Sequence, residues 1–513
     1  MFTSSIDKDQ IFRYDKHMVR YIDQYPNDHS CHIKTGGTVM QIFDTFVQKL
    51  KYRVLKEVAS HAYADNLQDC YLDIPKIISP GPRSELRCCI YKERAIVAER
   101  VKIAMGGDKA NPNVVEVIGI ACDECPISGY TVGPDCRGCL AHRCSTVCKQ
   151  NAITFDERHR ACIDPDKCVN CGKCATVCPY SAIQNHTRPC ERACKVKAIT
   201  QGENHVAAID DSKCIQCGAC MYHCPFGAIQ DKSYLLDAIR LLRNRISNIY
   251  AVVAPAISAQ FTHAKVGQVV TALKRMGFTK VIEAALGADM VALEEAKELE
   301  EKGFLTSSCC PAFVNYIEKS FPQLSVHISH NPSPMAALAK AIKTMEPDAK
   351  VIFIGPCTAK KQEAQKAEVK PYVDCVLTFE ELQAWLDSRG MVLSTLPEEP
   401  LDDASFYGRI FARSGGLAQA VAHVLDEKGS DFILNPVICD GIEACRIALL
   451  KKDKNVLKEN FIEGMACNGG CISGAGCLTH GDKDVGLVEK YGKAAVHGSS
   501  AEAVEKYRAA TGE

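Results

Sequence analysis

The chain has 513 residues, more than the about 250–300 residues at which a single hydrophobic core stops growing, so several domains are expected. A net charge of −1 argues against a nucleic-acid partner, and no apolar run approaches the ~20 residues that span a membrane. The polar first residues contain no signal-peptide core, which predicts a cytoplasmic protein. Thirty cysteines, many only two or three positions apart, indicate metal binding rather than disulfides in that compartment.

Residues 1–115 are predicted to form a mainly helical N-terminal domain of unknown role. Apolar residues recur at helical spacing over 39–50, which predicts a helix there. Cys31 and Cys70 are isolated and are interpreted as core residues, since a free thiol behaves as a small hydrophobe. The adjacent pair Cys88-Cys89 is predicted to be buried for the same reason.

Residues 116–232 contain a cysteine repeat that predicts ferredoxin-like 4Fe–4S modules. Two units read C-x2-C-x2-C-x3-C-P, a run in which three thiols bind one cube and the fourth binds the neighbouring cube. A zinc ribbon would need its C-x2-C pairs 15–20 residues apart. The two complete units are Cys168, Cys171, Cys174 and Cys178, and Cys214, Cys217, Cys220 and Cys224.

Two further units are less regular, and their spacing determines how the four units pair. The same interval of 30 positions separates Cys148 from Cys178 and Cys194 from Cys224. It predicts two modules with crossed ligation. The three predicted cubes are held by Cys136, Cys139, Cys144 and Cys178; by Cys168, Cys171, Cys174 and Cys148; and by Cys214, Cys217, Cys220 and Cys194. Joining the two complete units directly would change each fourth ligand but not the number of complete cubes.

Two repeat cysteines, Cys190 and Cys224, are left two ligands short of a cube. Cys122 and Cys125 could supply these ligands and complete a fourth accessory cluster. The alternative is a lost cluster whose thiols are now inert. The sequence leaves the two possibilities open.

Residues 233–513 are predicted to form an α/β domain with parallel sheets. Buried strands are predicted at 249–254, 280–285 and 349–354, with helices at 264–276 and 288–302 between them. Cysteine segments begin where strands end, and sites in such sheets lie at the carboxyl ends of the strands. The fold class is therefore an α/β domain around a buried metal cofactor, preceded by α+β ferredoxin-like modules and a mainly helical domain.

Three segments of this region carry thiols: Thr306-Ser307-Ser308-Cys309-Cys310-Pro311, Pro356-Cys357-Thr358-Ala359-Lys360-Lys361-Gln362-Glu363, and Met465-Ala466-Cys467-Asn468-Gly469-Gly470-Cys471-Ile472-Ser473-Gly474-Ala475-Gly476-Cys477. If the third segment is helical, its first two thiols lie one turn apart on one face. Together the segments resemble the signatures of the iron–iron (FeFe) hydrogenases, over roughly residues 116–480. The resemblance is to the monomeric ferredoxin-linked type, in a branch that lacks the plant-type ferredoxin domain.

The resemblance implies an H-cluster, a 4Fe–4S cube bridged to a two-iron subsite with CO, cyanide and dithiolate ligands. The four cube ligands would be Cys310, Cys357, Cys467 and Cys471, of which Cys471 would also bridge to the subsite. Lys360 matches the lysine that contacts a cyanide, with Lys361 as its competitor for that role. Glu363, Met465 and Pro255 match other residues around the cofactor.

The resemblance also implies a proton path. Cys309 matches the thiol beside the cofactor, and Glu295, Glu298 and Ser333 match the groups behind it. Composition alone would make 294–302 a solvated charged helix face. Lys302 stands where the better-known branch has an arginine.

The implied function is reversible reduction of protons to H2, with electrons relayed through 4Fe–4S clusters to or from ferredoxin or a similar carrier. Hydrogenase maturation proteins would insert the cofactor. Two alternatives share much of this sequence pattern: an H2 sensor of low turnover, and an iron–sulfur assembly protein without the two-iron subsite. A plain polyferredoxin would leave the region after residue 249 unexplained.

Overall fold

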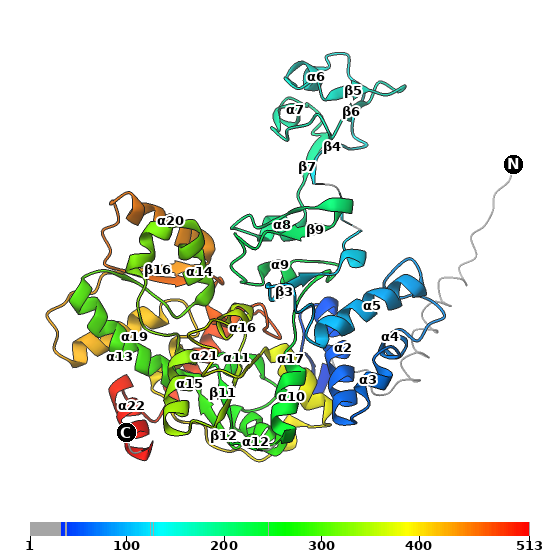
Figure 1. Cartoon of the computed structure of the whole chain (residues 1–513). Helices are drawn as coiled ribbons and strands as arrows, with labels where there is room; N and C mark the ends of the chain where they lie inside the picture. The colour runs from blue at the N-terminus through cyan, green and yellow to red at the C-terminus, as the bar shows by residue number, and fades with distance from the viewer. Residues whose placement is uncertain (1–31, 36–37, 124, 127, 245, 512–513) are drawn as a thin grey trace.

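A computed structural model describes residues 32–35, 38–123, 125–126, 128–244 and 246–511. In Figure 1 the N-terminal helices lie against one side of a large α/β body, and the iron–sulfur modules rise away from both. The prediction for Cys31 falls outside the described residues.

The N-terminal part begins with a strand pair, so the helix predicted over 39–50 is wrong in its first half. β1 (His32–Thr35) and β2 (Thr38–Gln41) pair antiparallel, and the first long helix is α2 (Phe46–Tyr63). The Thr45 hydroxyl accepts from the Gln48 amide and the Gln48 side chain accepts from the Thr45 amide, a capping box that fixes where α2 begins. The helices that follow are α3 (Leu67–Cys70), α4 (Ile74–Ile78) and α5 (Ile90–Ala104).

The thiols of this part lie nearer the surface than predicted. Cys88 and Cys89 are exposed and Cys70 is half-buried. Cys89 caps α5, where its sulfur accepts from the Lys92 amide. A cap position at the surface therefore explains the failed prediction for the Cys88-Cys89 pair.

Two iron–sulfur modules follow, and one is inserted into the other. β4 (Gly129–Val132) pairs antiparallel with β7 (Ile183–His186), so the chain leaves and returns at one stem, which carries the outermost part of the molecule in Figure 1. We call residues 129–186 the first module. The second module, residues 115–123, 125–126 and 188–231, is built from both flanks of this insertion. Strand β3 (Val115–Val117) pairs antiparallel with β10 (Ile229–Asp231) and joins the two flanks.

The remaining elements of both modules are short, as expected for loops that surround clusters. Those of the first module are α6 (Arg143–Thr146), β5 (Ile153–Phe155), β6 (Ala161–Ile163) and α7 (Lys173–Thr176). Those of the second are β3 (Val115–Val117), α8 (Pro189–Ala193), β8 (Ile199–Gln201), β9 (Ala207–Ile209), α9 (Ala219–Tyr222) and β10 (Ile229–Asp231).

The α/β body contains two parallel sheets, which confirms the predicted fold class. The larger has the strand order β12–β11–β14–β15 and the smaller β13–β17–β16. The strands are β11 (Ile249–Val253), β12 (Lys280–Glu283), β14 (Lys350–Ile354) and β15 (Cys375–Leu377), and β13 (Leu305–Thr306), β16 (Pro436–Asp440) and β17 (Phe461–Met465).

Helices cover these sheets, and the one that follows β12 begins earlier than predicted. It starts directly at Ala284, so the predicted strand over 280–285 ends at Glu283. The helices are α10 (Leu235–Asn244), α11 (Ile257–Gln260), α12 (Val266–Met276), α13 (Ala284–Lys302), α14 (Pro311–Ser320), α15 (Pro334–Met345), α16 (Thr358–Glu363), α17 (Phe379–Ser388), α18 (Phe406–Ile410), α19 (Gly416–Glu427), α20 (Ile442–Asp453), α21 (Asp484–Lys493) and α22 (Ser500–Thr511).

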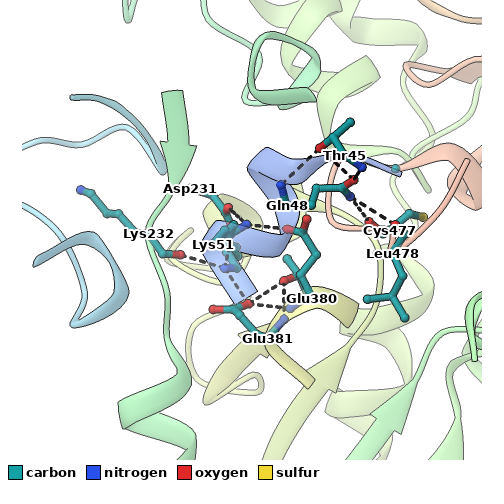
Figure 2. A network of polar contacts seen from close by, with 12 residues as sticks. Thr45, Gln48, Lys51, Asp231, Lys232, Glu380, Glu381, Cys477 and Leu478 are labelled. Atoms are coloured by element: carbon teal, nitrogen blue, oxygen red, sulfur yellow. Dashed lines mark hydrogen bonds and ion pairs between the residues drawn. The ribbon is translucent and has the colours of Figure 1, made fainter. Parts of the chain in front are cut away.

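The N-terminal helices share a core and a buried ionic network with the α/β body. Val54 and Leu55 of α2 belong to the same hydrophobic cluster as Trp385 of α17. Beside this core, Lys51 donates to Asp231 and to Glu380, at 2.5 and 2.6 Å (Figure 2). Helix α2 is therefore attached to the body by apolar packing and by charge.

The same network reaches two cysteine-bearing segments. The ammonium of Lys361 on α16 lies 2.8 Å from both Asp231 and Glu381. The side-chain amide nitrogen of Gln48 on α2 donates to the backbone carbonyls of Cys477 and Leu478, at 3.0 and 3.3 Å (Figure 2). Helix α2 therefore stabilises the segment that contains Cys357, through the shared Asp231 carboxylate, and the segment that contains Cys471, through Gln48.

Candidate functional site

Four thiols converge where strands of both sheets end. Cys310 follows β13, Cys357 follows β14, and Cys467 and Cys471 follow β17. Burial first, and then the neighbouring thiols, raise the pKa of Cys357 to about 11 and that of Cys471 to about 12. Burial likewise raises the pKa of Cys467, which Cys357 and Cys310 raise further. The four predicted cube ligands are therefore brought together.

A turn separates Cys467 from Cys471, which begins a short 3-10 helix (Cys471–Ser473), so the two thiols do not lie on the one continuous helix considered from the sequence. The Gly470 amide donates to the Cys467 carbonyl at 3.1 Å, and Gly469 and Gly470 adopt φ of +83° and +92°. A Cβ on Gly470 would stand 2.7 Å from the Ser414 backbone nitrogen. Glycine is thus required here by backbone conformation and by close approach, and the turn brings the thiols together.

A largely apolar cavity adjoins these thiols, with an empty volume of about 590 Å³. Its residues come from the ends of strands in both sheets and from α13, α15, α16 and α18. The lining includes the predicted site residues Pro255, Cys309, Cys357, Lys360, Met465 and Cys471. A pocket with few polar groups, each well placed, is the usual form of a cofactor site.

Lys360 is the lysine that faces this cavity, and Lys361 is held elsewhere by its two carboxylates. The Lys360 ammonium donates to Glu363 at 2.7 Å and to the Cys309 carbonyl at 3.4 Å. Burial alone would lower the pKa of Lys360, but the Glu363 carboxylate outweighs burial and raises it. The predicted choice of Lys360 over Lys361 agrees with this geometry.

Behind the cavity, Glu295 of α13 is fully buried and near Cys309. Neither carboxylate oxygen of Glu295 makes a hydrogen bond to another described residue. Burial raises the pKa of Glu295 to about 8. A carboxyl with a pKa near the ambient pH can both accept and donate a proton. Burial and then Glu295 raise the pKa of Cys309 well above its ordinary value.

Ser329, rather than the predicted Ser333, lies between Glu295 and Glu298. Its hydroxyl donates to Glu298 at 2.9 Å, and it is close enough to Glu295 to oppose the rise in that pKa. Ser333 instead caps α15, where its hydroxyl accepts from the Ala336 amide. The structure therefore places Ser333 at the start of α15, where its position before Pro334 suits a helix cap, and not in hydrogen-bond contact with Glu298.

Glu298 carries this chain of polar groups to the surface. Its carboxylate lies 2.6 Å from the Lys302 ammonium and 2.7 Å from the His330 ring. The buried face of α13 thus differs from the solvated charged face that composition alone would favour.

One buried carboxylate near the site was not predicted. Glu463 on β17 accepts from the amides of Gly415 and Ala418 at 2.7 and 2.8 Å, and burial raises its pKa to about 7. Its charge contributes to the raised pKa of Cys309. The available signal was a single acid in an otherwise apolar strand beside Met465.

In the first module, the thiols of one predicted crossed set line a common cavity, and those of the other set lie close by. One cavity, of about 710 Å³ of empty volume, is lined by Cys148, Cys168, Cys171 and Cys174. Burial, and then Cys139 and Cys136, raise the pKa of Cys144. Cys178 packs in the same apolar cluster as Cys136 and Cys144.

In the second module, the third predicted set lies beside the α/β body. Burial, and then Cys217, Cys214 and Cys194, raise the pKa of Cys220 well above its ordinary value. Cys217 in turn contributes to the raised pKa of Cys467 in the active-site group. A cleft lined by Cys194, Cys217 and Cys467 separates the two groups.

The two remaining repeat thiols, Cys190 and Cys224, lie in the second module together with Cys122 and Cys125. Cys375, Cys439 and Cys445 are buried and pack as core residues. Among the described residues, no three His, Cys, Asp or Glu side chains converge tightly enough to hold a single ion. Thiols that each bind a different iron of one cube are spaced more widely than that.

Family models match three parts of the chain. Residues 247–475 match the C-terminal domain of the iron only hydrogenase large subunit. Residues 135–182 match a 4Fe-4S dicluster domain, and residues 207–230 match a 4Fe-4S binding domain. Within the described part of the chain, no helix has the length and apolarity needed to cross a membrane.

The similar curated proteins include hydrogenases and an assembly factor. Iron hydrogenase 1 of Clostridium pasteurianum is 30% identical over 275 residues, 44% of this chain and 47% of that protein. The periplasmic Fe hydrogenase large subunit of Nitratidesulfovibrio vulgaris is 29% identical over 384 residues, 63% of this chain and 87% of that protein. The cytosolic Fe-S cluster assembly factor NAR1 of Kluyveromyces lactis is 39% identical over 87 residues, 17% of this chain and 19% of that protein.

The chain thus spans about half the length of the Clostridium relative. Among solved structures, apo FeFe-hydrogenase HydA1 from Chlamydomonas reinhardtii is 21% identical. The match covers 54% of this chain and 94% of that chain, with a TM-score of 0.46.

Proposed function

Since residues 247–475 belong to the iron-only hydrogenase family, we propose that this protein catalyses the reversible reaction 2H⁺ + 2e⁻ ⇌ H2 at an H-cluster. The observation that carries this proposal is the cavity onto which Cys309, Lys360 and Cys471 open from three different chain segments. These segments meet only because two sheets place their strand ends together.

The residues present suit both parts of an H-cluster. Cys310, Cys357, Cys467 and Cys471 would hold the cube, since thiolates from several segments are the usual ligands of a 4Fe–4S cluster. Cys471 lines the cavity and would bridge to the two-iron subsite. When bound, this cofactor supplies the redox centre at which protons and electrons combine.

The cavity walls would orient the subsite and exclude water. Pro255 and Met465 contribute apolar surface to the wall, while Lys360 supplies a buried cation for a cyanide ligand. A charge-assisted hydrogen bond of this kind is stronger in an apolar pocket than in water. Glu363 holds the Lys360 ammonium in place.

Protons would travel along Cys309, Glu295, Ser329 and Glu298, and exchange with solvent beside Lys302 and His330. Proton transfer needs donor and acceptor within hydrogen-bond reach or one water apart. The Ser329 hydroxyl donates to Glu298 and lies close to Glu295, and the elevated pKa of Glu295 keeps a transferable proton near neutral pH. Cys309 is the thiol that stands between Glu295 and the cavity.

Electrons would pass through the three predicted accessory cubes. The first module is outermost in Figure 1, so it is the natural place for a ferredoxin or similar carrier to dock. The cube held by Cys194 and the second complete unit would be the last before the active site, because Cys217 faces Cys467. Insertion of the two-iron subsite would require hydrogenase maturation proteins.

The relatives also include a cytosolic Fe-S cluster assembly factor. The alternative function is therefore an assembly protein that holds cubes but no two-iron subsite. Such a protein has no use for a second, apolar cavity beside the cube. The buried Lys360, the Cys309–Glu295 pair and that cavity therefore favour the enzyme.

The proposal is tested by producing the chain with and without hydrogenase maturation proteins. H2 evolution is measured with reduced methyl viologen, and H2 uptake with the oxidised dye. Activity in both directions, dependent on maturation, is expected. Matured protein with its full iron content and no activity in either direction would overturn the proposal.

A further inference from the structure

We propose that the second module binds a fourth accessory 4Fe–4S cube through Cys122, Cys125, Cys190 and Cys224. The proposal does not depend on hydrogenase activity. Cys122, Cys190 and Cys224 belong to one buried cluster, and Cys125 lies within electrostatic reach of Cys122 and Cys224. The four thiols come from both flanks of the inserted first module, which is why the sequence separates them.

Backbone hydrogen bonds to sulfur show that the two modules share one plan. The Ala161 amide on β6 donates to Cys136 in the first module, and the Ala207 amide on β9 donates to Cys122 in the second, both at 3.4 Å. Strands β6 and β9 are the second strands of equivalent antiparallel pairs. Cys122 therefore occupies in the second module the position that Cys136 occupies in the first.

The other ligands correspond in the same way. The Ala152 amide donates to Cys148, and the Ala198 amide donates to Cys194, four residues beyond the sulfur in each case. The C-x3-C pair that ends at Cys194 is thus the counterpart of the pair that ends at Cys148. The C-x2-C pair of Cys122 and Cys125 completes a set whose counterpart is Cys136, Cys139, Cys144 and Cys178.

Two buried arginines give an independent reason to place an anion among these thiols. Arg188 and Arg100 are only 1% and 2% exposed, and neither makes an ion pair with a carboxylate among the described residues. Both terminal nitrogens of Arg188, and Nε and Nη1 of Arg100, have no hydrogen-bond partner there. Arg188 acts electrostatically on Cys125 and Arg100 on Cys224.

Each guanidinium donates to one backbone carbonyl, Arg188 to Pro126 and Arg100 to Phe226. Its charge and its other nitrogens stay uncompensated, which is costly for a group that has lost its water. A 4Fe–4S cube with four thiolate ligands carries net negative charge and offers sulfur acceptors. It would compensate both arginines at once. Four inert thiols would leave both cations uncompensated.

The fourth cube would also make the electron path continuous. Cys190 lies within electrostatic reach of Cys220, a ligand of the cube nearest the active site. The second module stands between the first module and the α/β body in Figure 1. Electrons from the first module would therefore pass through the proposed cube.

The first test is an iron count on the full chain, reconstituted with iron and sulfide in the absence of maturation proteins. Wild type should bind about twenty irons, for four accessory cubes and the active-site cube. Cys122→Ala/Cys125→Ala should lose about four irons. The matched control, Cys88→Ala/Cys89→Ala at the exposed pair, should lose none. Equal iron in the two double variants would overturn the proposal.

A second test does not remove any ligand. Arg188→Gln should keep the full iron content but lower the midpoint potential of one cluster signal in potentiometric EPR, because a cation that favours the reduced state is gone. Arg240→Gln, an exposed arginine on α10, is the control and should shift no signal. An unchanged set of potentials in Arg188→Gln would show that no cluster lies beside that side chain.

Discussion

Lys51→Met should weaken the attachment of α2 to the α/β body. The side chains of Lys51, Asp231 and Glu380 are only 11%, 1% and 4% exposed. After the substitution, Lys361 is the lysine of this network that remains for its three carboxylates, Asp231, Glu380 and Glu381. Removing one partner of a buried ion pair typically costs about 3–5 kcal/mol.

That cost corresponds to an increase of roughly 100-fold to 3,000-fold in the equilibrium constant for detachment of α2, at about 1.4 kcal/mol per factor of ten. Amide hydrogen exchange within α2, measured by mass spectrometry, reports such local opening without assuming two-state unfolding of the whole chain. Lys76→Met, which removes an exposed pair with Asp73, is the control and should cost only about 0–1 kcal/mol.

Lys51→Met combined with Glu380→Gln should recover part of the protection, since the unpaired buried charge is then removed. Exchange in α2 of Lys51→Met no faster than in Lys76→Met would refute the claim that this network holds the helix.

Three further predictions concern the site. Cys309→Ala should keep iron content and infrared signature but lose turnover by about 100-fold or more, and Cys309→Asp should recover part of it; wild-type turnover in the alanine variant would exclude Cys309 from the relay. Cys471→Ser should abolish H2 evolution, because one thiolate would join cube and subsite; normal turnover would remove its bridging role. Burial raises the folded-state pKa of Glu295 from 4.5 to about 8, so the stability present below pH 4.5 is lost as pH rises toward 8. Glu295→Gln avoids that loss, so its gain in Tm over wild type should be larger at pH 8 than at pH 5; an equal gain at both pH values would contradict the raised pKa.

Local patterns in the sequence predicted the parallel sheets and identified the three cysteine segments of the candidate site. Strands such as Ile249–Val253 are short and wholly apolar. This pattern is typical of strands buried in a parallel sheet and can be read without knowing their neighbours. The family resemblance implied Ser333 and did not point to Ser329. Their roles differ only through tertiary neighbours, Glu298 for one and the start of α15 for the other.

Other features depend on contacts that no local pattern encodes. Gln48 and Cys477 are 429 positions apart, yet they are joined by a hydrogen bond. The turn at Gly469 and Gly470 replaced a helix because close approach of the Ser414 backbone, itself distant in sequence, requires left-handed glycine there. Likewise, the sequence left the grouping of Cys122 with Cys190 open, and the structure places both in one cluster because β4 and β7 pair and close the insertion between them.

Infrared spectroscopy of the matured protein tests the central claim most directly. An H-cluster carries CO and cyanide ligands, whose stretching bands lie in a region where a 4Fe–4S cube alone does not absorb. We expect such bands in wild-type protein produced together with hydrogenase maturation proteins, and no such bands in protein produced without them. Matured protein that holds all its cubes but shows no CO or cyanide bands would contradict the account and leave an iron–sulfur protein without the two-iron subsite.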